Sequence, residues 1–177
     1  MSKVKIISYS QTDDNKDLMD QVAYCARVSN PSNQSNTKTN KKLIKYLIKN
    51  QHWSPFEMVS LCMEINTTRD IAKQILRHRS FSFQEFSQRY AKPSELDEMF
   101  SVRECRMQDE TNRQNSIETD DEEMHREWER HQGRVLHFAK DVYKWAIKKG
   151  IAKEQARAVL PEGLTNTRLY MNGTLRS

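Results

Sequence analysis

The stretch from Glu122 to Lys149 constrains the fold of this chain more than any other segment. Its apolar residues recur at helical spacing, which is typical of one long amphipathic α-helix. This apolar stripe comprises Trp128, Val135, Phe138, Ala139, Val142 and Ala146. Gly150 follows directly, and glycine commonly ends a helix because it adopts a left-handed conformation without steric cost. The sequence therefore predicts one long helix that the rest of the fold must accommodate.

Shorter periodic segments precede and follow the long helix. The expected strands cover residues 4–9 and 59–65, and the expected helices cover residues 14–28, 41–50, 67–79, 152–161 and, at the end of the chain, 164–177. Thr67 and Asp70 resemble a capping box that opens a helix ending in Arg77-His78-Arg79. Ser54-Pro55 is typical of the start of a turn or helix.

Two polar stretches interrupt this pattern and are expected to be loops. Residues 29–40 are rich in Ser, Asn and Thr, and residues 109–121 have almost no apolar side chains. The second is expected to be mobile. Neither stretch has the features of a linker between domains, so the chain is expected to form a single domain over residues 1–177.

Composition excludes several classes of protein. Four glycines, with no GxGxxG or GxxxxGK[ST] pattern, argue against a glycine-rich phosphate loop. The formal charge of +5 favours anionic partners in general, although solubility alone accounts for it. Three separated cysteines without a CxxC pair or a signal peptide indicate reduced thiols in a cytoplasmic compartment. The apolar runs are too short to span a membrane.

A cationic cluster near the middle of the chain is the strongest candidate site. Arg77-His78-Arg79 ends a predicted helix, and Glu85, Ser87 and Arg89 share one face if the following segment is extended. Arginine offers paired donors to phosphate and a flat face for stacking on rings, so the cluster suits a nucleotide. The alternative is that Glu85 and Arg89 merely form an ion pair across a solvated strand.

The helical wheel of residues 68–79 raises a second alternative. Gln74, Arg77 and His78 fall within one arc, whereas Arg79 falls among the apolar residues. Either the helix ends before Arg79, or this guanidinium points inward to an anionic partner, because an unpaired buried charge is costly.

Other polar residues give weaker indications. His125, His131 and His137 recur every six residues and would point about 120° apart on a helix, so no metal site is expected. Cys62 is interpreted as a packed small residue, and no elbow motif supports a serine nucleophile. His52, at a helix-to-turn junction, has either a structural role or a ligand-binding one.

The run from Arg77 to Tyr90 resembles the signature of the flavin-dependent thymidylate synthases, which is RHR followed by SxxExSxRY. Three further segments resemble elements of the same family. These are Ala26-Arg27-Val28-Ser29, His52-Trp53-Ser54-Pro55-Phe56-Glu57 and Ala156-Arg157-Ala158-Val159-Leu160-Pro161. The stretch from Asn172 to Ser177 also resembles a family segment ending in Arg-Ser, so the likeness covers nearly the whole chain.

The resemblance implies an α+β fold, a mostly antiparallel sheet flanked by helices, and a homotetramer. It implies methylation of dUMP to dTMP, with methylenetetrahydrofolate as carbon donor and reduced FAD, recharged by NADPH, as hydride source. By the same resemblance, dUMP would contact Gln74, Arg77, Glu85, Ser87, Arg89 and Arg157. FAD would contact Ser54, Arg77, His78, Arg79, Glu85 and Arg176, and His52 would lie near flavin and folate. No membrane or nucleic-acid partner is expected.

The residues themselves agree with this chemistry. No cysteine stands beside a base, so thiolate attack on uracil has no candidate. Catalysis would depend on orienting and polarising the uracil, while the cofactor carries the redox step. Ser87 is interpreted as a binding hydroxyl and not as the nucleophile.

Two departures from the family pattern leave alternatives open. Thr174 stands where many members have Asn, which puts a flavin contact there in doubt. The family continues with a segment that carries an activating arginine, whereas this sequence stops at Ser177. The chain is therefore expected to be a fragment, a truncated reading frame or one half of a split enzyme. The competing functions are a catalytically deficient nucleotide- and flavin-binding module and a basic nucleic-acid-binding protein.

Overall fold

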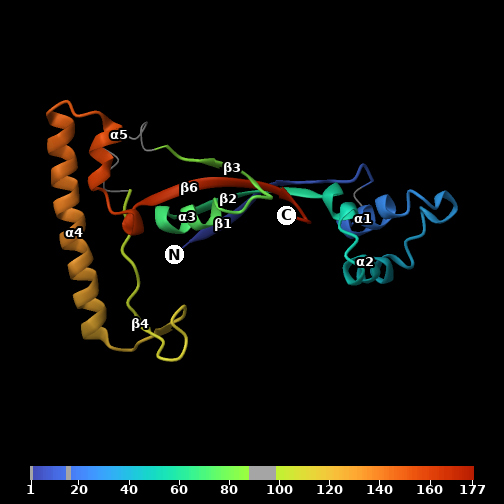
Figure 1. Cartoon of the computed structure of the whole chain (residues 1–177), viewed down its shortest axis with the longest axis horizontal. Helices are drawn as coiled ribbons and strands as arrows, with labels where there is room; N and C mark the ends of the chain where they lie inside the picture. Colours follow the sequence, from blue (N-terminus) through green and yellow to red (C-terminus); the bar gives the residue numbers. More distant parts are fainter. Residues whose placement is uncertain (1, 15–16, 88–98) are drawn as a thin grey trace. The chain divides into compact units, whose positions relative to one another are not determined.

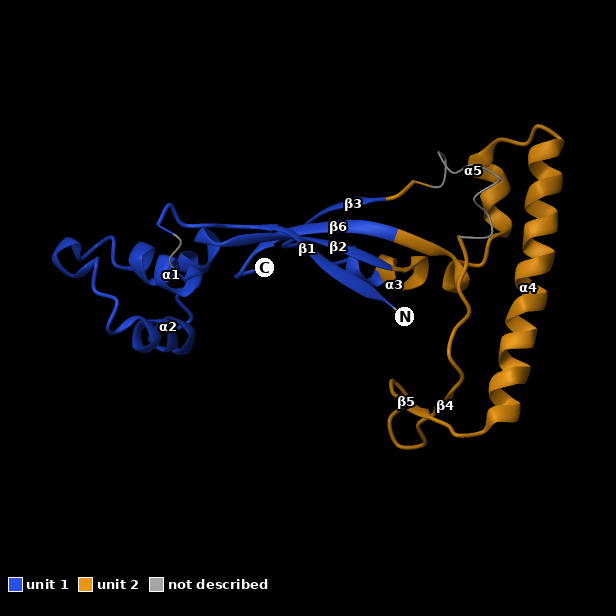
Figure 2. Ribbon diagram, turned by 180° about the vertical axis from the view of Figure 1, so that it is seen from behind, with its two compact units in different colours: residues 1–66, 74–85, 168–177 blue, residues 67–73, 86–167 orange. Residues whose placement is uncertain are grey.

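The computed structural model describes residues 2–14, 17–87 and 99–177. The chain forms two compact units (Figure 2). Unit 1 comprises residues 1–66, 74–85 and 168–177, and unit 2 comprises residues 67–73 and 86–167. The single domain expected over residues 1–177 stays a prediction. No helix of the described ranges combines the length and the apolar character that crossing a membrane would require.

A four-stranded sheet has the order β1-β2-β6-β3 (Figure 1). Its strands are β1 (Lys3–Tyr9), β2 (Ser60–Thr68), β3 (Ser82–Glu85) and β6 (Asn166–Thr174). The pairs β1–β2 and β3–β6 are antiparallel, with Lys3 opposite Asn66 and Ser82 opposite Asn172. With the long helix described below, the sheet confirms the predicted α+β class.

The expected helix over residues 164–177 is wrong, because this segment forms β6 at the centre of the sheet. Burial along β6 alternates: Thr167 and Leu169 are buried, whereas Arg168 and Tyr170 are exposed. That period of two is the signature of a strand. Leu169 is fully buried, so a side chain from this segment is packed on all sides.

Two helices and a 3-10 turn pack together in unit 1. They are α1 (Leu18–Ala26), α2 (Asn40–Lys49) and η2 (Ser54–Met58), and a further 3-10 turn, η1 (Pro31–Asn33), lies in the expected loop. The helix expected from residue 14 begins at Leu18 because the Asp17 carboxylate caps it, accepting from the Met19 N–H at 2.7 Å. Burial of Val22, Ala23 and Leu47 stabilises the pair.

Helix α3 (Arg69–Ile75) is shorter than predicted. It ends before Arg77, whose N–H donates to Gln74 O at 3.3 Å, while the His78 N–H donates to Ile75 O at 3.0 Å. The predicted capping box is also wrong, because Thr67 lies within β2. The Thr68 hydroxyl instead donates to Asp70 at 2.6 Å.

The long helix α4 (Glu122–Lys148) confirms the central prediction of the sequence (Figure 1). Its Asp121 cap accepts from the Met124 N–H at 2.9 Å. The predicted buried stripe is only partly correct, because Trp128, Val135 and Phe138 are exposed. The side chains that α4 buries are Gln132, Leu136, Ala139, Tyr143 and Ala146.

The helix α5 (Lys153–Ala156) and the 3-10 turns η4 (Arg157–Val159) and η5 (Glu162–Leu164) follow α4. Tyr143 and Ala146 of α4 form a buried cluster with Ala156 and Leu160, against which Met99, Phe100 and Ile147 pack. The first turns after Gly150 therefore fold back on the C-terminal part of α4. Burial in this cluster raises the pKa of Tyr143.

The loop expected over residues 109–121 contains part of a hairpin between β4 (Arg106–Gln108) and β5 (Ser116–Glu118). The Asp109 carboxylate organises its turn by accepting from the N–H groups of Asn112 and Thr111 and from the Asn115 amide. These hydrogen bonds hold the pKa of Asp109 well below its usual range. A polar segment with almost no apolar residues therefore has a defined structure through side-chain hydrogen bonds.

Candidate functional site

Most of the predicted site residues belong to unit 1. They are His52, Ser54, Gln74, Arg77, His78, Arg79, Glu85 and Arg176. Ser87 and Arg157 belong to unit 2, and Arg89 lies outside the described residues. Unit 1 therefore provides the part of the site whose geometry can be built from contacts.

The three side chains of the Arg77-His78-Arg79 turn are exposed. Helix α3 ends before Arg79, so the first of the two alternatives is correct and this guanidinium is not buried among apolar side chains. Arg77 Nη1 donates to Gln74 Oε1 at 3.1 Å, which links two of the residues expected to bind nucleotide. Within the described ranges, no carboxylate forms an ion pair with these three side chains. The positive charge of Arg77 and Arg79 is therefore available to an anionic ligand.

His78 lies in a defined ring and hydrogen-bond environment. Its imidazole centroid is 4.6 Å from that of Phe81, with the rings tilted by 59°. Its Nδ1 accepts from the Ser80 N–H at 3.3 Å. A local hydrogen bond and a ring contact therefore restrict an otherwise exposed side chain.

Glu57 joins the turn η2 to the C-terminal end of β6. Its Oε2 accepts from the Thr174 hydroxyl at 2.9 Å, and its Oε1 accepts from Arg176 Nη1 at 2.8 Å. The hydrogen bond from Thr174, followed by that from Arg176, lowers the pKa of Glu57 below its ordinary value. Sequence reasoning assigned no role to Glu57, although it lies in a segment that resembles the family.

Ser177 ties the same end of β6 to the cationic turn. Its hydroxyl donates to Ser80 O at 3.1 Å and accepts from the Thr174 N–H at 3.0 Å. Three segments far apart in sequence, at residues 54–58, 77–82 and 174–177, are thus connected by side-chain hydrogen bonds. The sequence analysis identified these segments separately, and local sequence does not show that they are in contact.

His52 and Ser54 lie on either side of Trp53, at the entry to η2. The His52 N–H donates to Leu47 O at 2.9 Å, and its exposed ring is edge-on to Tyr46, with centroids 5.8 Å apart. The preceding residue, Gln51, has φ 59, so α2 ends in a left-handed residue that turns the chain toward His52. The His52 side chain is therefore open to a ligand.

Glu85 is the last residue of β3, where it lies opposite Leu169 and is half-buried. Strand β3 ends there, so Ser87 lies beyond it. Arg89 lies outside the described residues, and the shared face of Glu85, Ser87 and Arg89 stays a prediction. Arg157 begins η4, and its Nε donates to Glu154 O at 3.3 Å.

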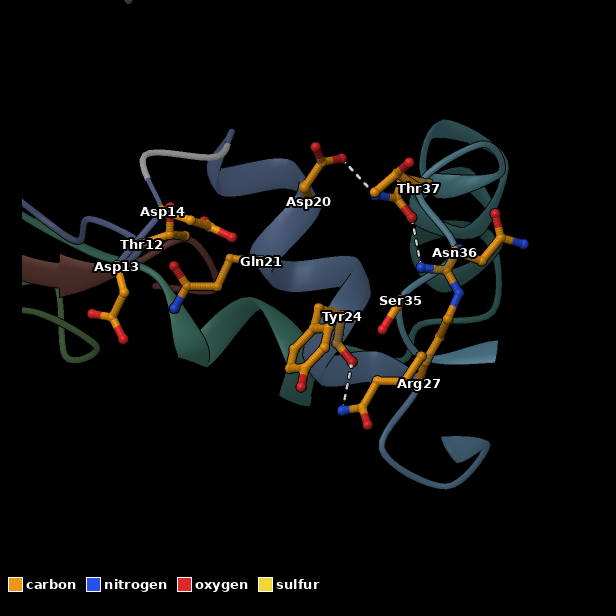
Figure 3. Close-up of a pocket in the computed structure, with 12 residues that line it drawn as sticks. Thr12, Asp13, Asp14, Asp20, Gln21, Tyr24, Arg27, Ser35, Asn36 and Thr37 are labelled. Carbon is orange, nitrogen blue, oxygen red and sulfur yellow. Dashed lines mark hydrogen bonds between the residues drawn. The ribbon is translucent and has the colours of Figure 1, made fainter. Parts of the chain in front are cut away.

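A separate pocket of about 380 Å³ lies beside α1 in unit 1 (Figure 3). Arg27, 7% exposed, lines it and donates to Asn40, whose amide in turn donates to Asp20 (Figure 3). This chain of hydrogen bonds brings a carboxylate near the buried guanidinium and links α1 to α2. None of the predicted site residues lines this pocket.

Comparison with known proteins identifies the family. The family model described as thymidylate synthase complementing protein matches residues 6–177. A probable flavin-dependent thymidylate synthase of Paramecium bursaria Chlorella virus 1 is 48% identical over 155 residues, covering 88% of this chain and 70% of that protein. The flavin-dependent thymidylate synthase of Synechocystis sp. is 49% identical over 156 residues, covering 88% and 69%. The chain belongs to the thymidylate synthase complementing protein family.

A solved structure also resembles the fold. The UMP/dUMP methylase PolB from Streptomyces cacaoi, bound with 5-Br dUMP, superposes with a TM-score of 0.79 and 26% identity. The superposition covers 98% of this chain and 73% of that one. The same methylase bound with 5-Br UMP gives a TM-score of 0.76.

Proposed function

We propose that this chain is a flavin-dependent thymidylate synthase that methylates dUMP to dTMP. The observation that carries the proposal is the near half identity, over 88% of the chain, to proteins bearing that name. The exposed cationic turn at residues 77–79 supports it, because its chemistry suits a nucleotide phosphate. A catalytically deficient binding module is not favoured, since named enzymes match across almost the whole chain.

Nucleotide binding would draw on cations and hydrogen-bonding groups. We propose that dUMP is bound by Gln74, Arg77, Glu85, Ser87, Arg89 and Arg157. Arg77 offers paired N–H donors to phosphate, and its bond to Gln74 keeps the amide beside it. Glu85, half-buried at the end of β3, can accept a hydrogen bond from the edge of a uracil ring.

The cofactor would be FAD, held by Ser54, Arg77, His78, Arg79, Glu85 and Arg176, with His52 beside flavin and folate. The residues fit this group, because Arg77 and Arg79 are exposed cations that form no ion pair with described carboxylates and are suited to a pyrophosphate. When bound, the flavin supplies the hydride; NADPH would recharge it and methylenetetrahydrofolate would provide the carbon. The protein's own contribution is to bind, orient and polarise the uracil.

No thiolate is required for this chemistry. Cys62 lies in the middle of β2 and is half-buried, and no described group of three His, Cys, Asp or Glu side chains could hold a metal ion. The carboxylate of Glu57 would keep Arg176 in place beside the cofactor.

We further propose that the chain forms a homotetramer, with α4 contributing one interface. Apolar residues, with His131 as the one exception, recur along α4 in alternating steps of four and three residues, which is the pattern of a coiled-coil seam. This seam comprises Met124, Trp128, His131, Val135, Phe138, Val142 and Trp145. It is largely exposed, with Phe138 at 72% and Trp145 at 56%, and it lies beside the stripe that α4 buries within unit 2.

Charges beside the seam favour an antiparallel copy of the same helix. Glu127, Arg134, Asp141 and Lys148 recur every seven residues and alternate in sign. An antiparallel arrangement centred between His137 and Phe138 would place Arg134 beside the partner's Asp141 and Glu127 beside the partner's Lys148. Opposite charges flanking an apolar seam set partner orientation in coiled coils.

Two assays test the proposed activity. Purified protein with FAD, NADPH and methylenetetrahydrofolate is expected to release tritium from dUMP labelled on the ring carbon that accepts the methyl group. Arg77→Ala is expected to weaken dUMP binding by about tenfold to a hundredfold, the worth of a lost charged hydrogen bond. Arg113→Ala, exposed in the β4–β5 turn, is the matched control. Wild-type protein with no affinity for FAD or dUMP would overturn the proposal.

A further inference from the structure

Gly173, near the end of β6, is buried in a place where no other side chain fits. A Cβ at this position would lie 2.2 Å from Cδ1 and 2.5 Å from Cε1 of Phe81, and 2.9 Å from Ser177 Oγ. Distances this short do not occur between nonbonded carbon atoms. The absence of a side chain at Gly173 therefore allows the Phe81 ring to lie directly on the backbone of β6.

The Phe81 ring in turn packs against His78. The centroids of the Phe81 and His78 rings are 4.6 Å apart, and the rings are tilted by 59°. The centroid of the Phe83 ring lies 6.3 Å from that of Phe81. Tilted aromatic pairs at such distances are attractive and have preferred orientations. The position of Phe81 thus restricts the rotation of the imidazole.

Hydrogen bonds complete the restraint on His78. The Ser80 N–H donates to its Nδ1, so a neutral ring carries its proton on Nε2. The Ser177 hydroxyl donates to Ser80 O at 3.1 Å and so stabilises the turn that contains His78 and Phe81. The imidazole accordingly presents one defined donor, Nε2–H, to whatever binds at the turn.

We propose that Gly173 and Phe81 are positioning residues that fix the orientation and tautomer of His78 for flavin binding. The proposal deepens the proposed function and depends on it, because His78 is expected to contact the flavin. Neither residue needs to touch the cofactor. They act through the ring contact with His78 and through the space that glycine leaves beside it.

Two measurements on the full-length chain test the proposal. The first is ¹⁵N NMR of the histidine rings, with the His78 signals assigned from a His78→Gln variant. Wild-type protein at neutral pH is expected to show the Nε2–H tautomer at His78, whereas Phe81→Ala is expected to show a mixture. The second is FAD affinity, which Phe81→Ala is expected to weaken by about fivefold to tenfold, the worth of one aromatic pair.

Additional variants separate positioning from general damage. Gly173→Ala should displace the Phe81 ring and reproduce both effects, and adding it to Phe81→Ala should weaken FAD binding no further. Phe81→Tyr keeps the ring and should restore both readings. Gly133→Ala is the matched glycine control, because a Cβ there meets nothing within 4 Å. If Gly173→Ala does not fold, Phe81→Ala and Phe81→Tyr decide the question.

The outcomes distinguish this inference from the proposed function. An unchanged His78 tautomer and unchanged FAD affinity in Phe81→Ala would overturn the positioning role. Wild-type protein that binds no FAD would overturn the proposed function and, with it, the cofactor part of the inference. The NMR comparison would then still show whether Phe81 orients His78.

Discussion

Replacing Phe138 with alanine tests the interface assigned to α4. Phe138 is 72% exposed in the isolated chain. An aromatic side chain has roughly 200 Å² of surface, so about 140 Å² is open on each copy. Burying that area is worth about 3.5 kcal/mol at roughly 25 cal/mol per Å². An alanine side chain retains about a third of this free energy of burial, so each copy loses about 2.3 kcal/mol.

A two-fold seam contains Phe138 twice, which doubles the loss to about 4.6 kcal/mol and raises the dissociation constant by about two-thousandfold. Sedimentation velocity over a concentration series measures this change directly. Lys144→Ala, on an exposed part of α4 outside the seam, is the control and should assemble like the wild type. Unchanged association of Phe138→Ala would refute the seam, whatever the oligomeric state of the protein.

Three further predictions concern stability. Hydrogen bonds from Thr174 and Arg176 lower the pKa of Glu57 below its ordinary value of 4.5. The ionised carboxylate therefore stabilises the folded state above pH 4.5, and this stabilisation is lost as the pH falls through the folded-state pKa. Acid titration of unfolding should therefore show a smaller loss below about pH 5 in Glu57→Gln than in the wild type. Leu169→Ala, at a fully buried position, should cost about 3 kcal/mol and lower Tm by roughly 6–12 °C in calorimetry. Gly150→Ala should cost about 1 kcal/mol in denaturant unfolding, because its φ of 80 disfavours a side chain.

Each of these stability predictions has an internal control. Leu175→Ala, at a half-exposed position beyond β6, should leave Tm almost unchanged. Gly133→Ala, in the middle of α4 with open space around it, should stabilise the helix slightly. Equal acid sensitivity of Glu57→Gln and the wild type would contradict the shifted pKa. A Leu169→Ala variant with wild-type Tm would contradict the packing of β6.

The sequence predicted the chemistry of the candidate site better than its geometry. Arg77, His78 and Arg79 were recognised as a cationic cluster because their charge and spacing are local features. The helix was nevertheless expected to continue through Arg79, although it ends at Ile75. Helical periodicity cannot show where a helix ends when no glycine or proline follows, and the i, i+3 bonds at Arg77 and His78 depend on the turn itself.

Local pattern was sufficient for some elements of this protein. The periodicity of residues 122–149 determined α4, and alternation determined β1 and β2, since each signal lies within one contiguous segment. Tertiary structure decided what a segment could not show by itself. Residues 166–174 became an interior strand because β2 and β3 pair with them on either side, and only one side of α4 packs within unit 2. Glu57, Gly173 and Ser177 gained their roles only when the chain brought residues separated by about a hundred positions into contact, and such contacts have no signal in local sequence.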